Sequence, residues 1–387
     1  MRALSASRIR ELVNEGLGNP DVLPFWVGEP DEPTPDFIRR AAIRAIEAND
    51  TFYTHNLGIA PLREELARYI SRLHRPTTPD NIAVTSAGVN ALMLASQLLL
   101  DQGDAVVEVT PLWPNLVEIP KILGAKVQCV QLKFSPDGWR LDLDELLAAL
   151  RPGTRALYVN SPNNPTGWTL SAAEQAAILA HCRRHGIWIF ADDAYERLYF
   201  GDEKHAAGPG AAATAPSFLD IAAADERIVS ANTFSKSWLM TGWRLGWLVV
   251  PDTLTADLGK LIEYNTSCAP GFVQRAGLVA VRDGETVIAR SVERFRAARD
   301  YLLPELNRIP GVRAATPAGA LYAFFRVEGV TDSLALCKRL VREVGLGLAP
   351  GSAFGPEGEG YVRWCFAASP ERLTDGIARL RAGLASG

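Results

Sequence analysis

The sequence predicts an α/β fold in which a mainly parallel sheet is covered by helices on both faces, followed by a smaller α+β region. Short apolar runs alternate with helix-like stretches through the middle of the chain. The chain has 387 residues, more than one simple core supports, and its pattern changes after about residue 270. Strand–helix alternation of this kind is typical of parallel sheets that are buried on both faces.

The central sheet is predicted from six apolar runs. They lie at residues 82–85, 105–109, 126–130, 156–160, 188–191 and 227–230. An Ala- and Leu-rich stretch at residues 90–100 is expected to form a helix between the first two strands. A second helix is expected over residues 171–185, because Gly186 follows it and glycine commonly ends helices.

Beyond the sheet, a long charged helix over about residues 287–308 leads into further short strands that lie among helices. This arrangement indicates a second, smaller domain of the α+β type. We therefore expect a large domain over residues 45–280. The small domain is expected to combine residues 1–44 with residues 281–387.

The composition is that of a protein that handles small molecules. Apolar residues make up 48% of the chain and charged residues 22%, and the net charge of −4 includes no long run of one sign. This balance offers no basic patch for nucleic acid or for a membrane surface. No apolar stretch approaches the roughly 18 residues of a membrane span, and the N-terminus lacks an apolar signal core. We expect a cytoplasmic protein.

Neither a disulfide framework nor a metal site is expected. The five cysteines lie far apart and form no C-x-x-C pair. His181 and His185 have the i, i+4 spacing that can bind a metal ion. They lie on a charged helix without a carboxylate in a matching motif, so we expect them on a solvated helix face.

A proline-rich turn follows one of the predicted strands. Residues 160–167 have the sequence Asn-Ser-Pro-Asn-Asn-Pro-Thr-Gly and come directly after the strand that begins near residue 156. Ligands of open α/β sheets bind at this carboxyl edge. A rigid turn alone explains the prolines and the glycine. The adjacent Asn163 and Asn164 supply amide donors that a turn does not need, which favours a binding role.

Polar motifs also follow two other strands. Asp192-Asp-Ala-Tyr195 ends one of them, where a carboxylate serves equally well in a turn or in catalysis. Lys236 follows the next strand, among hydroxyl and aromatic residues, with Arg244 eight positions later. Most lysines are surface residues. This setting, however, suits a lysine that forms a Schiff base with a carbonyl cofactor.

Six motifs together resemble the class I aminotransferases, which are pyridoxal-phosphate enzymes of fold type I. In chain order they are G-E-P-D-x-P-T-P, S-P-N-N-P-T-G, D-x-A-Y, S-K-x-x-x-x-T-G-W-R-x-G, P-G-S-A-F-G and V-R-W-C-F-A. They extend from about residue 20 to about residue 370. The resemblance implies transamination between an L-amino acid and a 2-oxo acid, in two half-reactions through pyridoxal and pyridoxamine phosphate.

The resemblance also implies roles for the residues around the cofactor ring. Lys236 corresponds to the Schiff-base lysine and proton shuttle. Asp192 corresponds to the partner of the pyridinium nitrogen, which keeps the ring protonated as an electron sink. Asn164 and Tyr195 correspond to hydrogen-bond partners of the ring hydroxylate. Trp113 corresponds to the aromatic residue that stacks on the ring.

For the cofactor phosphate, the resemblance implies a helix N-terminus and a fixed cation. The backbone N–H groups of Ala87, Gly88 and Val89 are expected to serve here, since this chain lacks the Ser or Thr that many relatives carry around this loop. Thr233 and Arg244 are expected to add a hydroxyl and a positive charge.

Two further residues are assigned by the same resemblance. Tyr53 corresponds to a tyrosine that reaches the phosphate of the partner subunit, which implies a homodimer with shared active sites. Arg363 corresponds to the arginine that binds the substrate α-carboxylate through two parallel hydrogen bonds. Gly28, Trp113 and Asn164 are expected to help bind the substrate.

The side-chain preference stays open. Trp26, Trp243 and Tyr322 are candidates for an aromatic-tolerant pocket, but each serves equally well as a core residue. The sequence identifies no second arginine for a distal carboxylate. We also expect the N-terminal segment around Gly28 to close over bound substrate.

Two other functions use the same residue types. A β-lyase or a decarboxylase of fold type I needs the same lysine and aspartate, although Arg363 favours proton removal over loss of the carboxylate. A non-catalytic ligand-sensing domain is the more distant alternative. It is disfavoured because Lys236 and Asp192 are both present.

Overall fold

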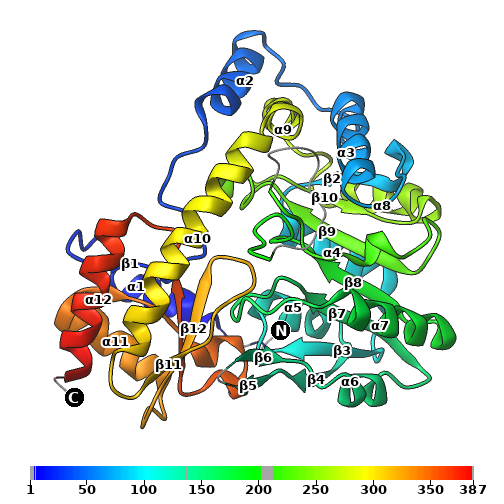
Figure 1. The fold of residues 1–387 in the computed structure, drawn as a ribbon. Coiled ribbons are helices and arrows are strands. Elements are labelled where there is room, and N and C mark those ends of the chain that lie inside the picture. The colour runs from blue at the N-terminus through cyan, green and yellow to red at the C-terminus, as the bar shows by residue number, and fades with distance from the viewer. Residues whose placement is uncertain (1–3, 5, 136, 202–211, 386–387) are drawn as a thin grey trace.

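A seven-stranded sheet forms the centre of the part of the chain that the computed structural model describes, which comprises residues 4, 6–135, 137–201 and 212–385 (Figure 1). Its strands follow the spatial order β2-β10-β9-β8-β7-β3-β4. Their bounds are Ile82–Thr85 (β2), Ala105–Thr110 (β3), Lys126–Gln131 (β4), Thr154–Asn160 (β7), Trp188–Asp192 (β8), Ile228–Thr233 (β9) and Gly246–Val249 (β10). The six predicted strands are confirmed, with ends that differ by a few residues.

Strand β10 is not among the strands predicted from the sequence. It runs antiparallel to both β2 and β9, whereas the other neighbouring strands of this sheet are parallel. The chain leaves β9 at Thr233, passes through the turn that carries Lys236 and returns along β9 as β10. The short apolar run of β10 directly follows the lysine motif, so the sequence pattern did not distinguish it as a separate strand.

Helices cover both faces of this sheet (Figure 1). Side chains alternate between the faces along each strand, so Val106 and Val107 of β3 belong to two different apolar cores. The core that contains Val106 includes side chains of α4 (Gly88–Leu99), α5 (Pro114–Ile122) and α8 (Thr255–Glu263). The core that contains Val107 includes side chains of α3 (Ala60–Leu73), α6 (Leu143–Ala149), α7 (Ala172–His185) and α9 (Gly271–Asp283).

Helix α7 ends at the predicted stop signal, and a capping box that was not predicted begins it. Ser171 and Glu174 form a capping box at its N-terminus. Gly186 follows its last residue in the left-handed conformation, with φ 66°, which glycine adopts without steric cost.

A second, antiparallel sheet of four strands lies toward the C-terminal part of the described chain, in the order β11-β12-β15-β14. Its strands are Val312–Ala314 (β11), Tyr322–Val327 (β12), Ala349–Pro350 (β14) and Tyr361–Cys365 (β15). The neighbouring helices are α10 (Glu285–Asn307), α11 (Ser333–Val344) and α12 (Pro370–Ala385) (Figure 1). The domain bounds near residues 45 and 280 stay a prediction.

The N-terminal segment lies against this second region. Helix α1 (Arg8–Glu15) contacts α11, and β1 (Leu23–Pro24) pairs in parallel with β13 (Leu346–Gly347). The next helix, α2 (Asp36–Glu47), packs instead against α9. A small hairpin of β5 (Lys133–Ser135) and β6 (Gly138–Arg140) follows the edge strand β4.

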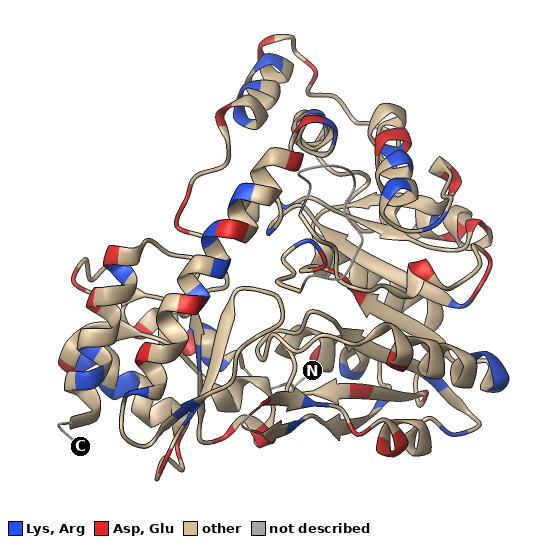
Figure 2. Ribbon diagram, in the orientation of Figure 1, with Lys and Arg blue, Asp and Glu red and all other residues tan. Residues whose placement is uncertain are grey.

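Charged residues of both signs are interspersed over the outer helices and loops (Figure 2). This distribution agrees with the absence of long single-sign runs in the sequence. Within the described residues, no helix combines the length and the apolar character that crossing a membrane requires.

Candidate active site

A cavity of about 600 Å³ opens where β7, β8 and β9 end, and residues of the second sheet complete its wall. This volume is in the range of about 300–1,000 Å³ that is usual for sites of small ligands and cofactors. The cavity brings together predicted site residues that are far apart in the sequence. They are Gly28, Gly88, Val89, Trp113, Asn164, Asp192, Tyr195, Thr233, Lys236, Arg244 and Arg363.

Asp192 is a buried carboxyl group at the end of β8. It lies beside Asn160, the last residue of β7, whose Nδ2 donates to the Asp192 backbone oxygen at 2.9 Å. The Ala194 N–H donates to Asp192 Oδ1 at 3.2 Å and fixes the carboxyl orientation. Burial raises the pKa of Asp192 to about 7, against the opposing effects of this N–H and of Lys236. A cationic ring nitrogen beside this carboxyl group would favour its ionised form.

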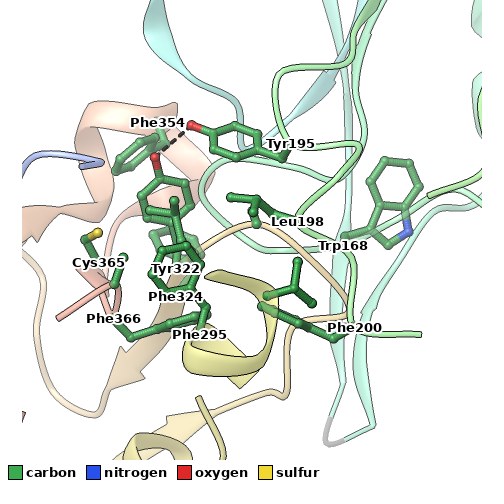
Figure 3. Close-up of a cluster of buried hydrophobic side chains, with 14 of the residues drawn as sticks. Trp168, Tyr195, Leu198, Phe200, Phe295, Tyr322, Phe324, Phe354, Cys365 and Phe366 are labelled. Carbon is green, nitrogen blue, oxygen red and sulfur yellow. Dashed lines mark hydrogen bonds between the residues drawn. The ribbon is translucent and has the colours of Figure 1, made fainter. Parts of the chain in front are cut away.

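Asn164 and Tyr195 form a hydrogen-bonded network with two residues of the second sheet. Asn164 Nδ2 donates to the Tyr195 hydroxyl at 3.4 Å, and this hydroxyl lies 2.7 Å from that of Tyr322 on β12. Figure 3 shows the two tyrosines pointing toward each other across the junction of the sheets. Burial, reinforced by Tyr322, raises the pKa of Tyr195 well above its ordinary value, so the phenol keeps its proton.

Arg363 is a buried cation on β15, and its guanidinium has hydrogen-bond donors that the described residues leave unpaired. Its guanidinium lies 4.4 Å from the ring centroid of Tyr322 and 4.8 Å from that of Phe354. One terminal nitrogen donates to Asn164 Oδ1 at 2.8 Å and the other to the backbone oxygen of Trp26. Its Nε has no hydrogen-bond partner among the described residues, although the side chain is only 2% exposed. Arg363 lines the cavity, and each of its terminal nitrogens has a second N–H that a carboxylate there would accept from.

Lys236 extends from the turn between β9 and β10, and its Nζ donates to the backbone oxygen of Gly28. Burial lowers the pKa of Lys236 to about 8, and the nearby charges of Arg363 and Arg244 act in the same direction. An amine with this pKa is about one-tenth unprotonated at pH 7, a far larger fraction than for an ordinary lysine. It is therefore suited to attack a carbonyl carbon and to exchange protons.

The amino end of α4 provides an anion-binding surface. Gly88 and Val89 line the cavity there, and neither a side-chain cap nor an acidic residue occupies the first turn of the helix. Thr233 and Arg244 line the same cavity. Backbone N–H groups, a hydroxyl and a guanidinium together suit a phosphate dianion.

This surface depends on close backbone packing. A Cβ added to Gly246 would lie 2.6 Å from the backbone nitrogen of Gly88, so only glycine fits in β10 at this point. Ala87, the N-cap of α4, has φ 102°, and Arg244 has φ 54°. Such conformations are uncommon for residues other than glycine and concentrate at functional sites. Ala87 is buried and does not itself line the cavity.

The remaining predicted residues differ in where they lie. Trp26 and Tyr322 line the cavity, whereas the Nε1 of Trp243 donates to Thr34 Oγ1 at 2.9 Å outside it. Tyr53 is 89% exposed and does not line the cavity of its own chain. Its expected role requires a partner subunit and stays a prediction.

Several residues that line the cavity were not predicted from the sequence. Asn160 begins the proline-rich motif, so its position at a strand end was a usable signal. Ser235, next to Lys236, and Arg10, in helix α1, carried no comparable signal. Within the described residues, no group of three or more His, Cys, Asp or Glu side chains is arranged to hold a metal ion.

Comparison with known proteins places this site in a family. Residues 20–380 match the family model described as "Aminotransferase class I and II". The aspartate aminotransferase of Pyrococcus horikoshii is 32% identical over 385 residues, which cover 98% of this chain and 95% of that protein. A probable N-acetyl-LL-diaminopimelate aminotransferase of Bacillus subtilis is also 32% identical, with coverage of 98% and 93%.

A solved structure gives the same result. The crystal structure of aspartate aminotransferase from Thermotoga maritima superimposes with a TM-score of 0.86 at 32% identity, covering 98% of this chain and 95% of that chain. The agreement extends over both sheets, because it includes nearly the whole chain. The protein therefore belongs to the class I and II aminotransferases and is an enzyme that transfers amino groups.

Proposed function

We propose that the enzyme exchanges an amino group between an L-amino acid and a 2-oxo acid, with pyridoxal 5'-phosphate bound at Lys236. One observation carries this proposal. A single cavity holds a lysine with a lowered pKa, a buried carboxyl group and a buried arginine with an unpaired donor. These are the groups needed to bind a carbonyl cofactor and an amino-acid carboxylate at the same time.

The lining of the cavity fits the cofactor at each end. The phosphate would be held by the N–H groups of Gly88 and Val89, by Thr233 and by Arg244, with Ala87 as the residue before the helix. The ring would be held by the set Trp113, Asn164, Asp192 and Tyr195. Pyridoxal phosphate supplies an electron sink that stabilises negative charge at the substrate α-carbon.

Arg363 would hold the α-carboxylate of the substrate, together with Gly28, Trp113 and Asn164. Each terminal nitrogen of Arg363 keeps one N–H beyond its bond to Asn164 or Trp26, and the rings of Tyr322 and Phe354 restrict the guanidinium. Holding the carboxylate fixes where the α-carbon lies relative to Lys236. A carboxylate bound to a buried cation is also stabilised in its charged form. This favours proton removal at the α-carbon over decarboxylation.

Lys236 would move the proton to and from the α-carbon through its Nζ. A group with a pKa of about 8 both accepts and returns a proton readily near neutral pH. The neutral phenol of Tyr195 and the amide of Asn164 would supply donors to the ring oxygen. The buried Asp192 would carry its negative charge opposite the ring nitrogen.

A homodimer with shared active sites is part of the proposal. Phe52 is 79% exposed and Tyr53 is 89% exposed, and these aromatic residues are adjacent in the chain. Exposed apolar surface of this kind is typical of a protein–protein contact. Sedimentation of the holoenzyme, together with cofactor retention in a Tyr53→Ala variant, tests whether a partner subunit completes the site.

The central test is an absorbance spectrum of the holoenzyme before and after addition of single amino acids, without any oxo acid. Conversion of the visible cofactor band to the shorter-wavelength aminated form is expected. Lys236→Ala should abolish both the lysine-linked band and turnover. Lys260→Ala is the matched control, because Lys260 is exposed and pairs with Asp257 on the same helix. Release of ammonia with pyruvate, or of carbon dioxide, would contradict transamination.

A further inference from the structure

The turn that follows β8 has two faces. Asp192 and Tyr195 line the cavity, whereas Asp193 and Glu196 do not line it. These two acidic residues are nevertheless buried, with exposed fractions of 6% and 4%. Neighbouring polar residues of one turn therefore lie in two different environments, one in the cavity and one behind it.

His74 occupies the environment behind the turn. It directly follows α3, and its side chain is fully buried. Nδ1 lies 2.8 Å from Asp220 Oδ1, and Nε2 lies 3.1 Å from Glu196 Oε2. An ionised carboxylate only accepts hydrogen bonds, so the ring satisfies both carboxylates only with a proton on each nitrogen. His74 is therefore an imidazolium between two acidic side chains.

Glu196 is fixed at its side chain and at its backbone. Its carboxylate faces His74, and its N–H donates to the backbone oxygen of Asp193 at 3.0 Å. Its own backbone oxygen accepts a hydrogen bond from the Ala215 N–H at 2.8 Å. A planar peptide joins Glu196 to Tyr195, so the placement of Glu196 also fixes the backbone from which the Tyr195 ring extends.

The hydroxyl of Tyr195 tolerates little movement. It lies 2.7 Å from the Tyr322 hydroxyl and 3.4 Å from Asn164 Nδ2. The longer contact is already near the outer limit of a hydrogen bond, so a shift of about 1 Å away from Asn164 would break it. The geometry at the ring-binding end of the cavity thus depends on how firmly the back of the turn is held.

The imidazolium also offsets negative charge behind Asp192. Asp193 Oδ2 accepts a hydrogen bond from Ser230 Oγ at 2.6 Å. Burial and the charge of Glu196 raise the pKa of Asp193, whereas the serine hydrogen bond and the charge of His74 lower it. The charge of Asp192 raises it as well, so the two neighbouring carboxyl groups interact. Loss of the imidazolium would leave more negative charge behind Asp192 and disfavour its ionised form.

We propose that His74 is a positioning residue for the reaction, which acts through Glu196 on the turn that carries Asp192 and Tyr195. The proposal rests on the function proposed above, in which these two side chains hold the cofactor ring. His74 itself is behind the turn and does not line the cavity. Its effect on the site is therefore expected to be transmitted by Glu196.

The second partner of His74 has no such connection to the site. Asp220 ends the short 3₁₀ helix Phe218–Asp220, where its Oδ2 accepts a hydrogen bond from the Ser217 N–H at 2.9 Å. It does not line the cavity. Glu196 and Asp220 thus face the same imidazolium, but only Glu196 belongs to the turn with the site residues. This difference provides a matched pair of variants.

The cofactor-free protein and the holoenzyme provide two measurements. His74→Gln leaves two buried carboxylates without their cation, so the turn is expected to shift. The affinity of the cofactor-free variant for pyridoxal phosphate, measured by calorimetry, should fall by roughly 10- to 100-fold, the range shown by residues that orient metal ligands. In the holoenzyme, the pH midpoint of the visible cofactor band should rise, because a displaced Tyr195 stabilises the ionised ring oxygen less.

Two double variants separate positioning from folding. Adding Glu196→Gln to His74→Gln removes the unpaired charge from the turn, so cofactor affinity and band midpoint should return toward the wild-type values. Adding Asp220→Asn instead removes the other charge and should recover thermal stability without recovering either measurement. Equal recovery by the two double variants would overturn the proposal, because it would indicate that His74 serves only the stability of the fold.

Single substitutions of the partners make the same comparison if His74→Gln does not fold. Glu196→Ala should weaken cofactor binding, whereas Asp220→Ala should lower the unfolding temperature and leave cofactor binding unchanged. Equal losses of cofactor affinity in these two variants would overturn the role of His74.

The outcomes also separate this inference from the proposed function. Unchanged cofactor affinity and band midpoint in His74→Gln would overturn the positioning role and leave the reaction class intact. Failure of the wild-type protein to bind pyridoxal phosphate would contradict the proposed function itself, and the inference with it.

Discussion

Nη1 of Arg363 donates a hydrogen bond to Oδ1 of Asn164 at 2.8 Å, and this contact joins β15 of the second sheet to the turn after β7. Asn164 also donates to the hydroxyl of Tyr195. One amide thus connects the proposed carboxylate-binding arginine with the proposed ring-binding tyrosine. Binding of the substrate and placement of the cofactor ring are therefore expected to depend on each other.

Asn164→Ala should weaken both functions at once. The substitution leaves a buried donor of Arg363 without its acceptor, at a cost of about 1.5–3 kcal/mol, or roughly 10- to 150-fold in binding. We expect a higher KM for the amino acid and weaker cofactor retention, measured by steady-state kinetics and by dialysis. Asn164→Asp is the informative companion, because it keeps the acceptor for Arg363 and removes the donor to Tyr195. Recovery of KM without recovery of cofactor retention would support separate roles for the two contacts.

Gly28→Ala should disrupt the site by steric overlap. An added Cβ would lie 1.9 Å from the Tyr322 hydroxyl, which hydrogen-bonds to Tyr195, and Gly28 also accepts the hydrogen bond of Lys236. Overpacking of this kind costs about 1–3 kcal/mol, and activity should fall more than stability because the displaced groups belong to the site. Thermal unfolding and turnover measure the two effects.

Two variants serve as controls for this prediction. Tyr322→Phe removes the overlapping hydroxyl, so the double variant with Gly28→Ala should recover part of the lost stability. Gly259→Ala in α8 is the neutral comparison, because its Cβ would meet nothing closer than 3.4 Å. Full activity in Gly28→Ala would contradict the packing of this segment against Tyr322.

His74 makes the stability of the fold depend on pH. Its ring nitrogens lie 2.8 Å from Asp220 and 3.1 Å from Glu196, the residue after Tyr195. Burial alone lowers the pKa of His74, but the hydrogen bonds to the two carboxylates outweigh it and raise the pKa to about 10. The imidazolium is therefore retained in the folded protein at pH values where the unfolded chain has released this proton.

The sign of the effect follows from these two pKa values. The stabilisation by His74 is fully present below the unfolded pKa of about 6.5 and is lost as the pH rises toward 10, by at most about 1.4 kcal/mol per pH unit. In urea unfolding, the stability difference between the wild type and His74→Gln should therefore narrow from pH 6.5 to pH 9. A difference that stays constant with pH would contradict a charged His74.

The sequence predicted those parts of the site that follow directly from strand ends. Asn164, Asp192 and Lys236 each come just after an apolar run, and parallel strands bring their carboxyl ends to one edge. The apolar runs themselves predicted six strands of the main sheet. They gave no indication of β10, whose antiparallel direction depends on the turn around Lys236 and not on any local periodicity.

Other features depend on contacts between distant segments. Arg10 lies in an ordinary amphipathic helix, and only the docking of α1 on α11 directs it into the cavity. His74 follows α3 in the sequence, while its two carboxylate partners are more than 100 residues away. A single sequence does not show which charged residues become buried together, because their local patterns resemble those of surface residues.

The lowered pKa of Lys236 predicts unusual reactivity of its amine in the cofactor-free protein. Burial lowers this pKa to about 8, whereas the exposed Lys260 has its pKa raised by its hydrogen bond to Asp257. Labelling by an amine-selective reagent, followed by peptide mass spectrometry, should show the modified fraction of Lys236 rising through pH 8. Lys260 should be labelled to the same extent only at a higher pH than Lys236. Parallel curves for the two lysines would contradict the lowered pKa, and with it the reason that Lys236 is suited to bind a carbonyl group near neutral pH.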